Sequence, residues 1–144
     1  SISADSLGSA ISEFATAITP AASTSRILII ANISIGDDAG HDGADNGVGI
    51  QLLRGTTLIG NGDGAGSRTS VAGYARVNTV HVMETVMIHH IDSPSTTSEI
   101  TYNFKYFLSK GSSGNVHTNR SNNDTDNADS PRTSSSVTLM EIGA

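Results

Sequence analysis

The chain lacks cysteine, carries little charge and has no long apolar run. Without cysteine it has neither a disulfide framework nor a thiolate metal site, and its redox compartment stays open. Only 15% of its residues are charged, and the net charge of −6 argues against nucleic-acid binding, because phosphate contacts need lysine and arginine. No apolar stretch reaches the roughly 20 residues that span a bilayer, so we expect no membrane insertion.

Serine, threonine, glycine and asparagine are the abundant residues instead. The strong helix formers do not follow a helical period, so this composition is typical of an all-β domain with many turns. The length suits one domain with a real core, residues 1–144, and no linker divides it. The first residue is Ser1, so either a start methionine has been removed or the chain is a piece of something longer.

Apolar residues at alternate positions predict about eight strands. In "EITYNFKYFLS", Tyr102, Phe104 and Tyr106 share one face. The apolar run "RILIIANISI" predicts a central strand covered on both sides, and "VGIQLLRGTTLIG" predicts a hairpin that turns at Arg54 and Gly55. Further strands are expected in "ISEFATAITP", "VNTVHVMETVMIHHI", "NVHTNR" and "SSVTLMEIGA". Turn signals at intervals of roughly 8–12 residues indicate a sandwich or a barrel.

The last predicted strand is apolar on both faces. Val137 and Leu139 alternate with Met140 and Ile142, although an edge strand is normally polar on one face. We therefore expect this strand to lie in the middle of a sheet or against another subunit.

Four stretches carry a resemblance to a known module: "ITPAASTSRILI", "LLRGTTLIGNGDGAGSRTS", "ETVMIHHIDSPSTTSEITYNFKY" and "NRSNNDTDNADSPRTSSSVTLMEIGA". In this order they resemble a β-sandwich module of tail-fibre and other virion structural proteins of tailed phages, especially marine ones. That module is similar to the trimeric jelly rolls of tumour-necrosis-factor-like and complement-type heads. The resemblance is weakest in residues 1–16 and 36–47. It implies a homotrimeric jelly-roll β-sandwich on a virion surface, with no chemistry of its own.

An acidic loop precedes the last strand. Asp124, Asp126 and Asp129 are flanked by Arg120 and Arg132. Alternate carboxylates on a loop can converge on calcium, but the glycine and glutamate of the helix-loop-helix calcium pattern are missing. Asparagine and aspartate also favour turns, because they hydrogen-bond their own backbone. We therefore interpret the loop as a turn clamped to the sheet by arginine–aspartate pairs.

A second acidic loop, residues 36–47, lies where the resemblance fails. Exposed loops on a rigid sandwich are a common place for recognition. We interpret this one as a solvated acidic loop, with a calcium or other divalent-cation site as the alternative. Its candidate binding residues are Asp37, Asp38, His41, Asp42 and Asp45.

The loop of residues 61–70, "NGDGAGSRTS", lacks the Gly-Lys-Ser/Thr ending of a phosphate-binding loop. We expect a tight connection in which Asp63 pairs with Arg68. Asn61 and Asp63 are candidate binding residues, and Tyr74 is a candidate for stacking on a sugar. His89 and His90 are adjacent in a predicted strand and point to opposite faces, so they do not share a metal.

No nucleophile-elbow motif is present, and we expect no enzyme activity and no resident cofactor or metal. The expected function is that of a tail-fibre domain on the virion exterior, which binds a host-surface glycan or protein through avidity. Its partners would be its own copies in a homotrimer and other virion proteins. The alternative is a capsid decoration protein that stiffens the phage head. A third class, a glycan hydrolase, lacks a convincingly placed carboxylate pair.

Overall fold

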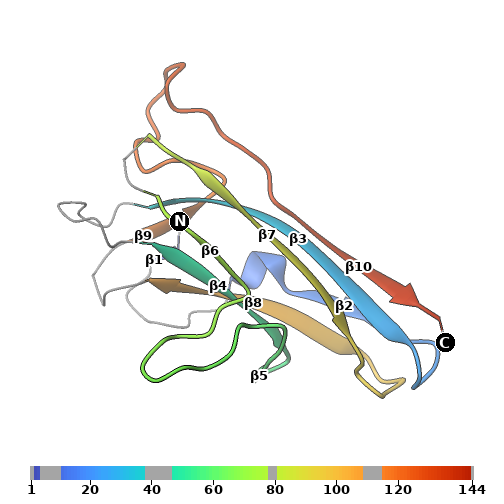
Figure 1. Ribbon diagram of the computed structural model, residues 1–144. Helices are drawn as coiled ribbons and strands as arrows, with labels where there is room; N and C mark the ends of the chain where they lie inside the picture. Colours follow the sequence, from blue (N-terminus) through green and yellow to red (C-terminus); the bar gives the residue numbers. More distant parts are fainter. Residues whose placement is uncertain (1, 4–10, 38–46, 78–80, 109–114, 144) are drawn as a thin grey trace.

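The computed structural model describes residues 2–3, 11–37, 47–77, 81–108 and 115–143. Among these residues, no helix has the length and apolar character needed to cross a membrane. The strands form two antiparallel sheets that pack face to face (Figure 1). The predicted all-β sandwich is thereby confirmed.

The first sheet, sheet A, is organised around β3 (Arg26–Asp37). One edge of β3 pairs with β7 (Glu84–Asp92), and the other pairs first with β10 (Ser136–Ile142) and then with β9 (Asn115–Thr118). The short strand β1 (Ile2–Ser3) pairs with β9. The apolar run therefore does form the central strand of its sheet, as the sequence predicts.

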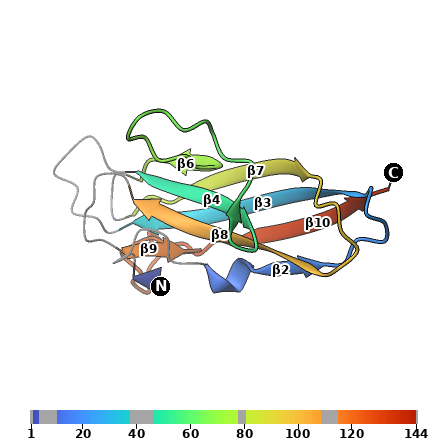
Figure 2. The same ribbon diagram turned by 90° about the horizontal axis from the view of Figure 1, so that it is seen from below.

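The second sheet, sheet B, is built on β4 (Val48–Arg54) and β8 (Ile100–Leu108). The short strand β2 (Thr16–Ile18) pairs with β8, and both β5 (Thr57–Leu58) and β6 (Gly73–Ala75) pair with the other edge of β4. The hairpin from β4 to β5 confirms the turn predicted at Gly55, which has a φ of +59°. Figure 2 shows β6 beside β7 on one flank of the sandwich and β2 beside β10 on the other.

The core lies between the two sheets and is filled by alternate residues of the long strands. Tyr102, Phe104 and Tyr106 are buried, as their spacing predicts. They share the core with buried residues of β4, in the same sheet, and of β3 and β7, in the opposite sheet: Val48, Ile50, Leu52, Ile27, Ile29, Ala31, Ile33, Ile35, Val86 and Ile88. The opposite face of β3 is different, because Leu28 and Ile30 are only half-buried there. The prediction that both sides of this strand are covered is therefore wrong on the outer side around Leu28 and Ile30, whereas Ser34 and Gly36 on that side are buried.

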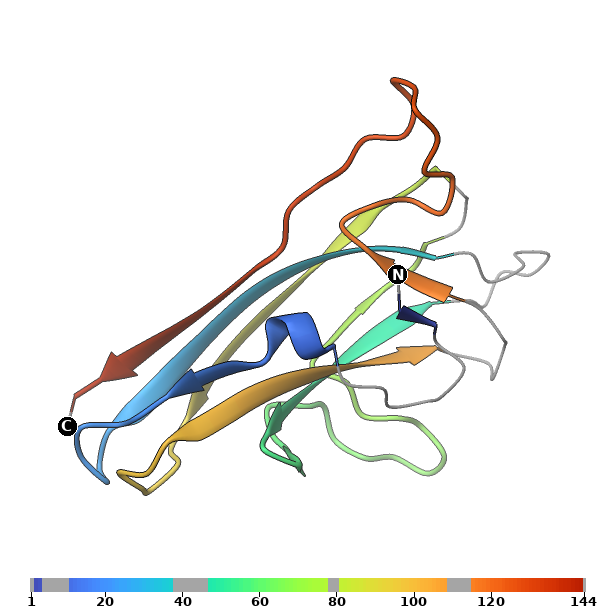
Figure 3. The same cartoon turned by 180° about the vertical axis from the view of Figure 1, so that it is seen from behind.

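Residues 11–18 do not form the single strand that the sequence predicts. A short 3-10 helix, η1 (Ser12–Phe14), precedes β2 (Figure 3). A 3-10 turn repeats every three residues, so it brings Ile11 and Phe14 to the same side, and both are buried in the core. A strand, with its period of two, would place these two residues on opposite faces.

Two further strand predictions need correction. The strand expected in "VNTVHVMETVMIHHI" begins only at Glu84, and residues 78–80 lie outside the described residues. In the described part of the chain β10 pairs with β3 alone, so it is an edge strand and not a central one. Its both-sided apolar pattern arises because Val137 and Leu139 pack against the core while Met140 stands outside.

Candidate functional site

The segment between β9 and β10, residues 119–135, projects beyond the body of the sandwich, and we call it the 119–135 arm (Figures 1 and 3). Its base is closed by backbone hydrogen bonds. The N–H of Asn119 donates to the carbonyl of Ser34, and the N–H of Thr133 donates to the carbonyl of Asn119. The hydroxyl of Ser135 donates to the Asn119 side chain at 2.6 Å and accepts from the N–H of Ser34. The arm is thus fastened to the central strand of sheet A.

Asp124 is the carboxylate that organises the arm. Arg132 donates to both of its oxygens, from Nε at 3.1 Å and from Nη2 at 2.7 Å. Nε of Arg120 lies 3.9 Å from Oδ2 of Asp124. The hydrogen bonds from Arg132 hold the pKa of the Asp124 carboxyl below its ordinary value. The structure therefore places an arginine–aspartate pair in the loop where the sequence predicts a clamp.

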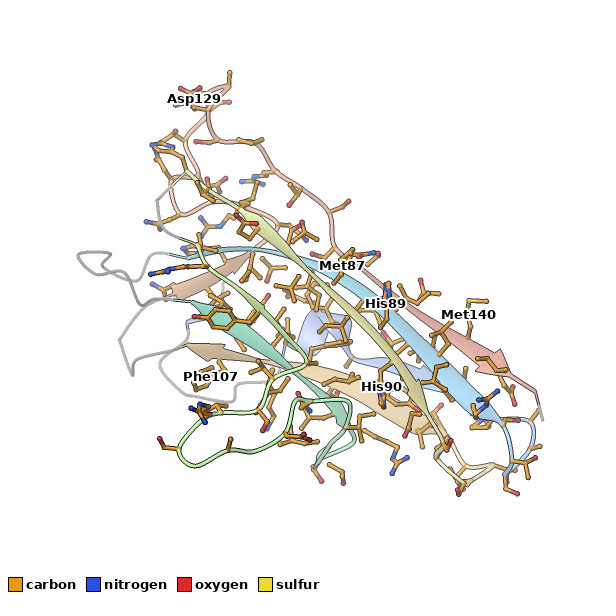
Figure 4. The ribbon with its side chains drawn as sticks, viewed as in Figure 1. Met87, His89, His90, Phe107, Asp129 and Met140 are labelled. Atoms are coloured by element: carbon orange, nitrogen blue, oxygen red, sulfur yellow. The ribbon has the colours of Figure 1, made fainter. Side chains whose placement is uncertain are left out.

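The other two aspartates of the predicted clamp are not part of it. Within the described residues neither Asp126 nor Asp129 forms an ion pair, and both are exposed. The tip is shaped instead by Asn127, whose side chain accepts from the N–H of Asp129 and donates to Thr125. Asp129 stands at the tip, away from the sandwich (Figure 4). A half-open hollow of about 380 Å³ is lined by Asp124, Thr125, Asp126, Asn127, Ser130 and Arg132.

Calcium is only the alternative interpretation of the two acidic loops, and the described residues give it no support. No group of three histidine, aspartate or glutamate side chains in the described segments comes together as a metal site. Of the second acidic loop, Asp38, His41, Asp42 and Asp45 lie outside the described residues, and Asp37 is described only as the last residue of β3. Its role in recognition stays a prediction.

The loop from Ile59 to Ala72 is anchored to β4 at both ends. The side chain of Asn61 accepts from the N–H of Leu52 at 3.3 Å and donates to its carbonyl at 3.0 Å. At the other end the N–H of Ala72 donates to the carbonyl of Ile50. Asn61 was a candidate ligand contact, but its amide is engaged by the backbone. It is a structural residue that holds the loop.

The tip of this loop is exposed, and its predicted ion pair is absent. In the structure Asp63 and Arg68 are not paired; Nη1 of Arg68 instead points to the carbonyl of Ala65 at 3.5 Å. Tyr74, predicted in a loop, lies in β6 and is half-exposed. Its hydroxyl lies so close to Gly47 that a Cβ there would collide with it. The hydroxyl is therefore packed at Gly47, which precedes β4, while 52% of the tyrosine stays exposed, and its role in sugar stacking stays a prediction.

A buried polar cluster joins the two sheets, and no motif in the sequence predicts it. Nη1 of Arg54, on β4, donates to both carboxylate oxygens of Asp92, on β7, at 3.0 and 2.9 Å. The hydroxyl of Tyr102, on β8, donates to Oδ2 of Asp92 at 2.8 Å. Burial and this hydrogen bond raise the pKa of the Tyr102 phenol. The one hint in the sequence is Asp92, a charged residue at an inward-facing position of a strand.

A second cross-sheet hydrogen bond lies toward the other end of the sandwich. The hydroxyl groups of Tyr106, on β8, and Thr118, on β9, are 3.0 Å apart. Burial raises the pKa of Tyr106 to about 12. Tyr102 and Tyr106 therefore fill the core with their rings and tie the sheets together with their hydroxyl groups.

The outer face of sheet A exposes several large apolar side chains. Met87, Ile91 and Met140 are among the most exposed large apolar side chains in the described residues, and all three project from this face. In Figure 4, Met87, His89 and Met140 lie across β7 and β10 on the same side of the sheet. His90 points the other way and packs against Gly60, so the two adjacent histidines occupy opposite faces, as predicted.

Comparison of the sequence with protein-family models finds no match, and comparison with curated proteins finds none either. The fold class therefore rests on the structure, and the resemblance to phage virion modules stays a prediction.

Proposed function

We propose that this chain is a non-enzymatic structural protein of a tailed phage, exposed on the virion exterior as a homotrimeric jelly-roll module. Its most favoured role is that of a tail-fibre domain that binds the host surface. The support comes from the quoted resemblance together with a two-sheet antiparallel sandwich that spans the described residues.

The order of the strands supports a jelly roll. β3 lies between β10 and β7 in sheet A, and β8 lies between β2 and β4 in sheet B. The long strands alternate between the sheets along the chain, from β3 to β4 and from β7 to β8. Strands that are distant in sequence are thus neighbours in space, which is what two interleaved Greek keys require.

The observation that carries the proposal is that exposed polar loops stand on a rigid frame. The loop of residues 59–72 is fixed to β4 by Asn61, and the 119–135 arm is fixed to β3 by Asn119 and Ser135. Recognition sites are commonly built from loops that a rigid sandwich positions. With a net charge of −6, attraction to an anionic cell wall is disfavoured, so hydrogen bonds are the expected contacts. Three copies would add weak sites by avidity.

The alternative is a capsid decoration protein that stiffens the phage head. The exposed apolar outer face of sheet A favours this second role, because a decoration protein is held in a shell by broad contact with its neighbours. The same fold serves both roles, so they differ only in location on the virion.

Immunogold electron microscopy on intact virions tests the proposal. An antibody raised against the purified chain is expected to place gold at the ends of the tail fibres. Gold spread over the head would reject the tail-fibre role and support capsid decoration. Absence of gold from every virion, with signal retained on the purified chain, would reject both roles. The control is the same antibody after adsorption with the purified chain.

A further inference from the structure

The hollow in the 119–135 arm is half-open and lined by polar residues. Its volume of about 380 Å³ lies near the lower end of the roughly 300–1,000 Å³ that ligand pockets occupy. It belongs to the part of the arm that stands away from the sandwich (Figures 1 and 3), so a chain attached to a small ligand can continue into solvent. None of its six lining residues is aliphatic or aromatic, which disfavours an apolar ligand.

Asp126 offers the hollow a carboxylate that is available to a ligand. Its side chain forms no hydrogen bond or ion pair in the described residues, whereas both oxygens of Asp124 receive hydrogen bonds from Arg132. An ionised carboxylate only accepts, and its two oxygens can receive two neighbouring hydroxyl groups at once. A cation would have to displace Arg132 from Asp124 to gain a second carboxylate. The lining therefore favours a hydroxylated ligand over a metal ion.

Hydrogen-bond donors line the same hollow. Arg132 uses Nε and Nη2 for Asp124, so Nη1 keeps both of its hydrogens without an acceptor in the described residues. Nδ2 of Asn127 donates to Oγ1 of Thr125, which lies 3.1 Å from Oγ of Ser130. Whichever hydroxyl group donates in this pair, the other keeps a proton that no acceptor among the described residues takes. Ser130 is only 8% exposed, so one of these hydroxyl groups is buried in the wall of the hollow.

The mixture of donors and acceptors suits a neutral sugar, because a sugar hydroxyl group both donates and accepts. The carboxylates of Asp124 and Asp126 outnumber the guanidinium of Arg132, so the lining is negatively charged and repels phosphates and acidic sugars. The N–H of Ser130 donates to the carbonyl of Asn127, which fixes the shape of the hollow before a ligand arrives. A wall that is already ordered lowers the entropy cost of binding.

We propose that the hollow of the 119–135 arm binds one neutral hexose unit of a host-surface glycan. Two adjacent hydroxyl groups of the sugar donate to the Asp126 carboxylate, and Nη1 of Arg132 donates to a sugar oxygen. The inference rests on the tail-fibre role proposed above, and it names the site and the class of sugar. One ring held by hydrogen bonds in an open hollow binds weakly, with a Kd of about 1–10 mM. Useful attachment then requires several copies of the site.

Amide chemical shifts of the isotope-labelled chain test the site directly. The probes are the methyl glycosides of glucose, galactose and mannose, which differ in the orientation of their adjacent hydroxyl groups. Each is added up to about 50 mM, well above the expected Kd. At least one of them is expected to shift the amide signals of residues 124–132 in a saturable way. Absence of such shifts with all three glycosides would overturn the proposal, and so would saturable shifts with calcium chloride alone.

Two matched substitutions assign the binding to the hollow. Asp126→Asn and Asp129→Asn each change an exposed aspartate without an ion pair in the described residues, but only Asp126 lines the hollow. Asp126→Asn is expected to raise the Kd at least about tenfold, because the amide keeps a single acceptor oxygen and loses the charge. Asp129→Asn is expected to leave the Kd unchanged, and the same spectra report whether each variant is folded. Equal weakening by the two variants would overturn the proposal.

This inference and the proposed function fail separately. Gold at the ends of the tail fibres without glycoside-induced shifts would keep the tail-fibre role and reject the hollow as its sugar site. Saturable shifts that Asp126→Asn weakens, together with absence of gold from every virion, would reject the virion role and keep the sugar site.

Discussion

Arg54 and Asp92 hold the two sheets together, since Nη1 of the arginine on β4 donates to both carboxylate oxygens of the aspartate on β7. The aspartate is 7% exposed and receives a third hydrogen bond from Tyr102. A carboxylate removed from water needs this full set of donors, because an unpaired buried charge is strongly destabilising. The cluster therefore ties β4 and β8 of sheet B to β7 of sheet A.

Removing the carboxylate should destabilise the fold. We expect Asp92→Ala to lower the free energy of unfolding by about 2–4 kcal/mol, less than for a fully buried pair because the Arg54 side chain is partly exposed. Tyr102→Phe removes one hydrogen bond to a charged group and should cost about 1–3 kcal/mol. Urea unfolding followed by circular dichroism measures both, with Asp63→Ala in an exposed loop as the control. Equal stability of Asp92→Ala and the control would contradict the role of the cluster.

The ion pair of the 119–135 arm should make stability fall in acid. The pKa of Asp124 is lowered in the folded protein, so its contribution is present above the ordinary aspartate pKa and is lost as the pH falls through the folded value. Asp124→Asn should therefore lower the melting temperature at pH 7 but not in acid, where the carboxylate is already protonated. The melting temperature of this variant should fall less with pH than that of the wild type. The pKa of Glu141 is also lowered, by hydrogen bonds from Ser25 and Ala21, and contributes in the same window.

Asp126→Asn is the matched control for that prediction. It changes an exposed aspartate of the same arm that forms no ion pair in the described residues. Melting temperatures of the wild type and both variants should be compared from pH 7 to pH 2.5. If Asp126→Asn flattens the acid profile as much as Asp124→Asn, the arginine clamp is not the source of the acid sensitivity.

The buried tyrosines should make stability fall in alkali. Burial raises the pKa of Tyr106 to about 12 from 10.0. Its contribution is therefore complete below pH 10 and is lost as the pH rises toward 12. A shift of this size corresponds to roughly 2–3 kcal/mol at about 1.4 kcal/mol per pKa unit. Urea midpoints from pH 9 to pH 11.5 should fall more steeply for the wild type than for Tyr106→Phe, and parallel profiles would refute the prediction.

In the loop of residues 59–72, replacing Gly60 by alanine should destabilise the protein more than replacing Gly66. Gly60 and Gly66 both have positive φ, +59° and +61°. A Cβ at Gly60 would lie 2.7 Å from Cγ of His90, whereas a Cβ at Gly66 meets nothing within 4 Å. Gly66→Ala should cost about 1–2 kcal/mol from backbone strain, and Gly60→Ala roughly 1–3 kcal/mol more from the clash. If both variants lose the same free energy of unfolding, the His90 side chain moves aside without cost and the prediction is wrong.

The class of fold was predictable because the long strands keep a period of two. Tyr102, Phe104 and Tyr106 are read correctly as core, and Gly55 as a turn, since both signals are local. The same rule fails at Ile11 and Phe14, where a 3-10 turn imposes a period of three. For β10 the pattern allows a central position or a subunit contact, and only the pairing of the strand, with β3 alone in the described residues, excludes the central position.

In the candidate site, only contacts between residues close in sequence could be predicted. Arg132 and Asp124 are close in sequence, and a loop brings them together. Asp92 and Arg54 meet only because β4 and β7 belong to different sheets that pack on each other, and no spacing in the sequence records that. Asp63 and Arg68 show the converse, because two opposite charges near each other in sequence stay apart on an exposed loop where water solvates both.

The position of β3 in the chain determines when sheet A can form during synthesis. Three of its neighbours, β7, β9 and β10, follow it in the chain, and Asn32 finds its partner in Ser136. Until β7 has been made, neither edge of β3 has a neighbour, and until β9 and β10 have been made, one edge still has none. Contacts of such long sequence separation form slowly. The protein is thus most prone to aggregate as a nascent chain that ends before Ile142. Force measurements on stalled ribosomes should detect the folding of sheet A only after Ile142 has left the exit tunnel.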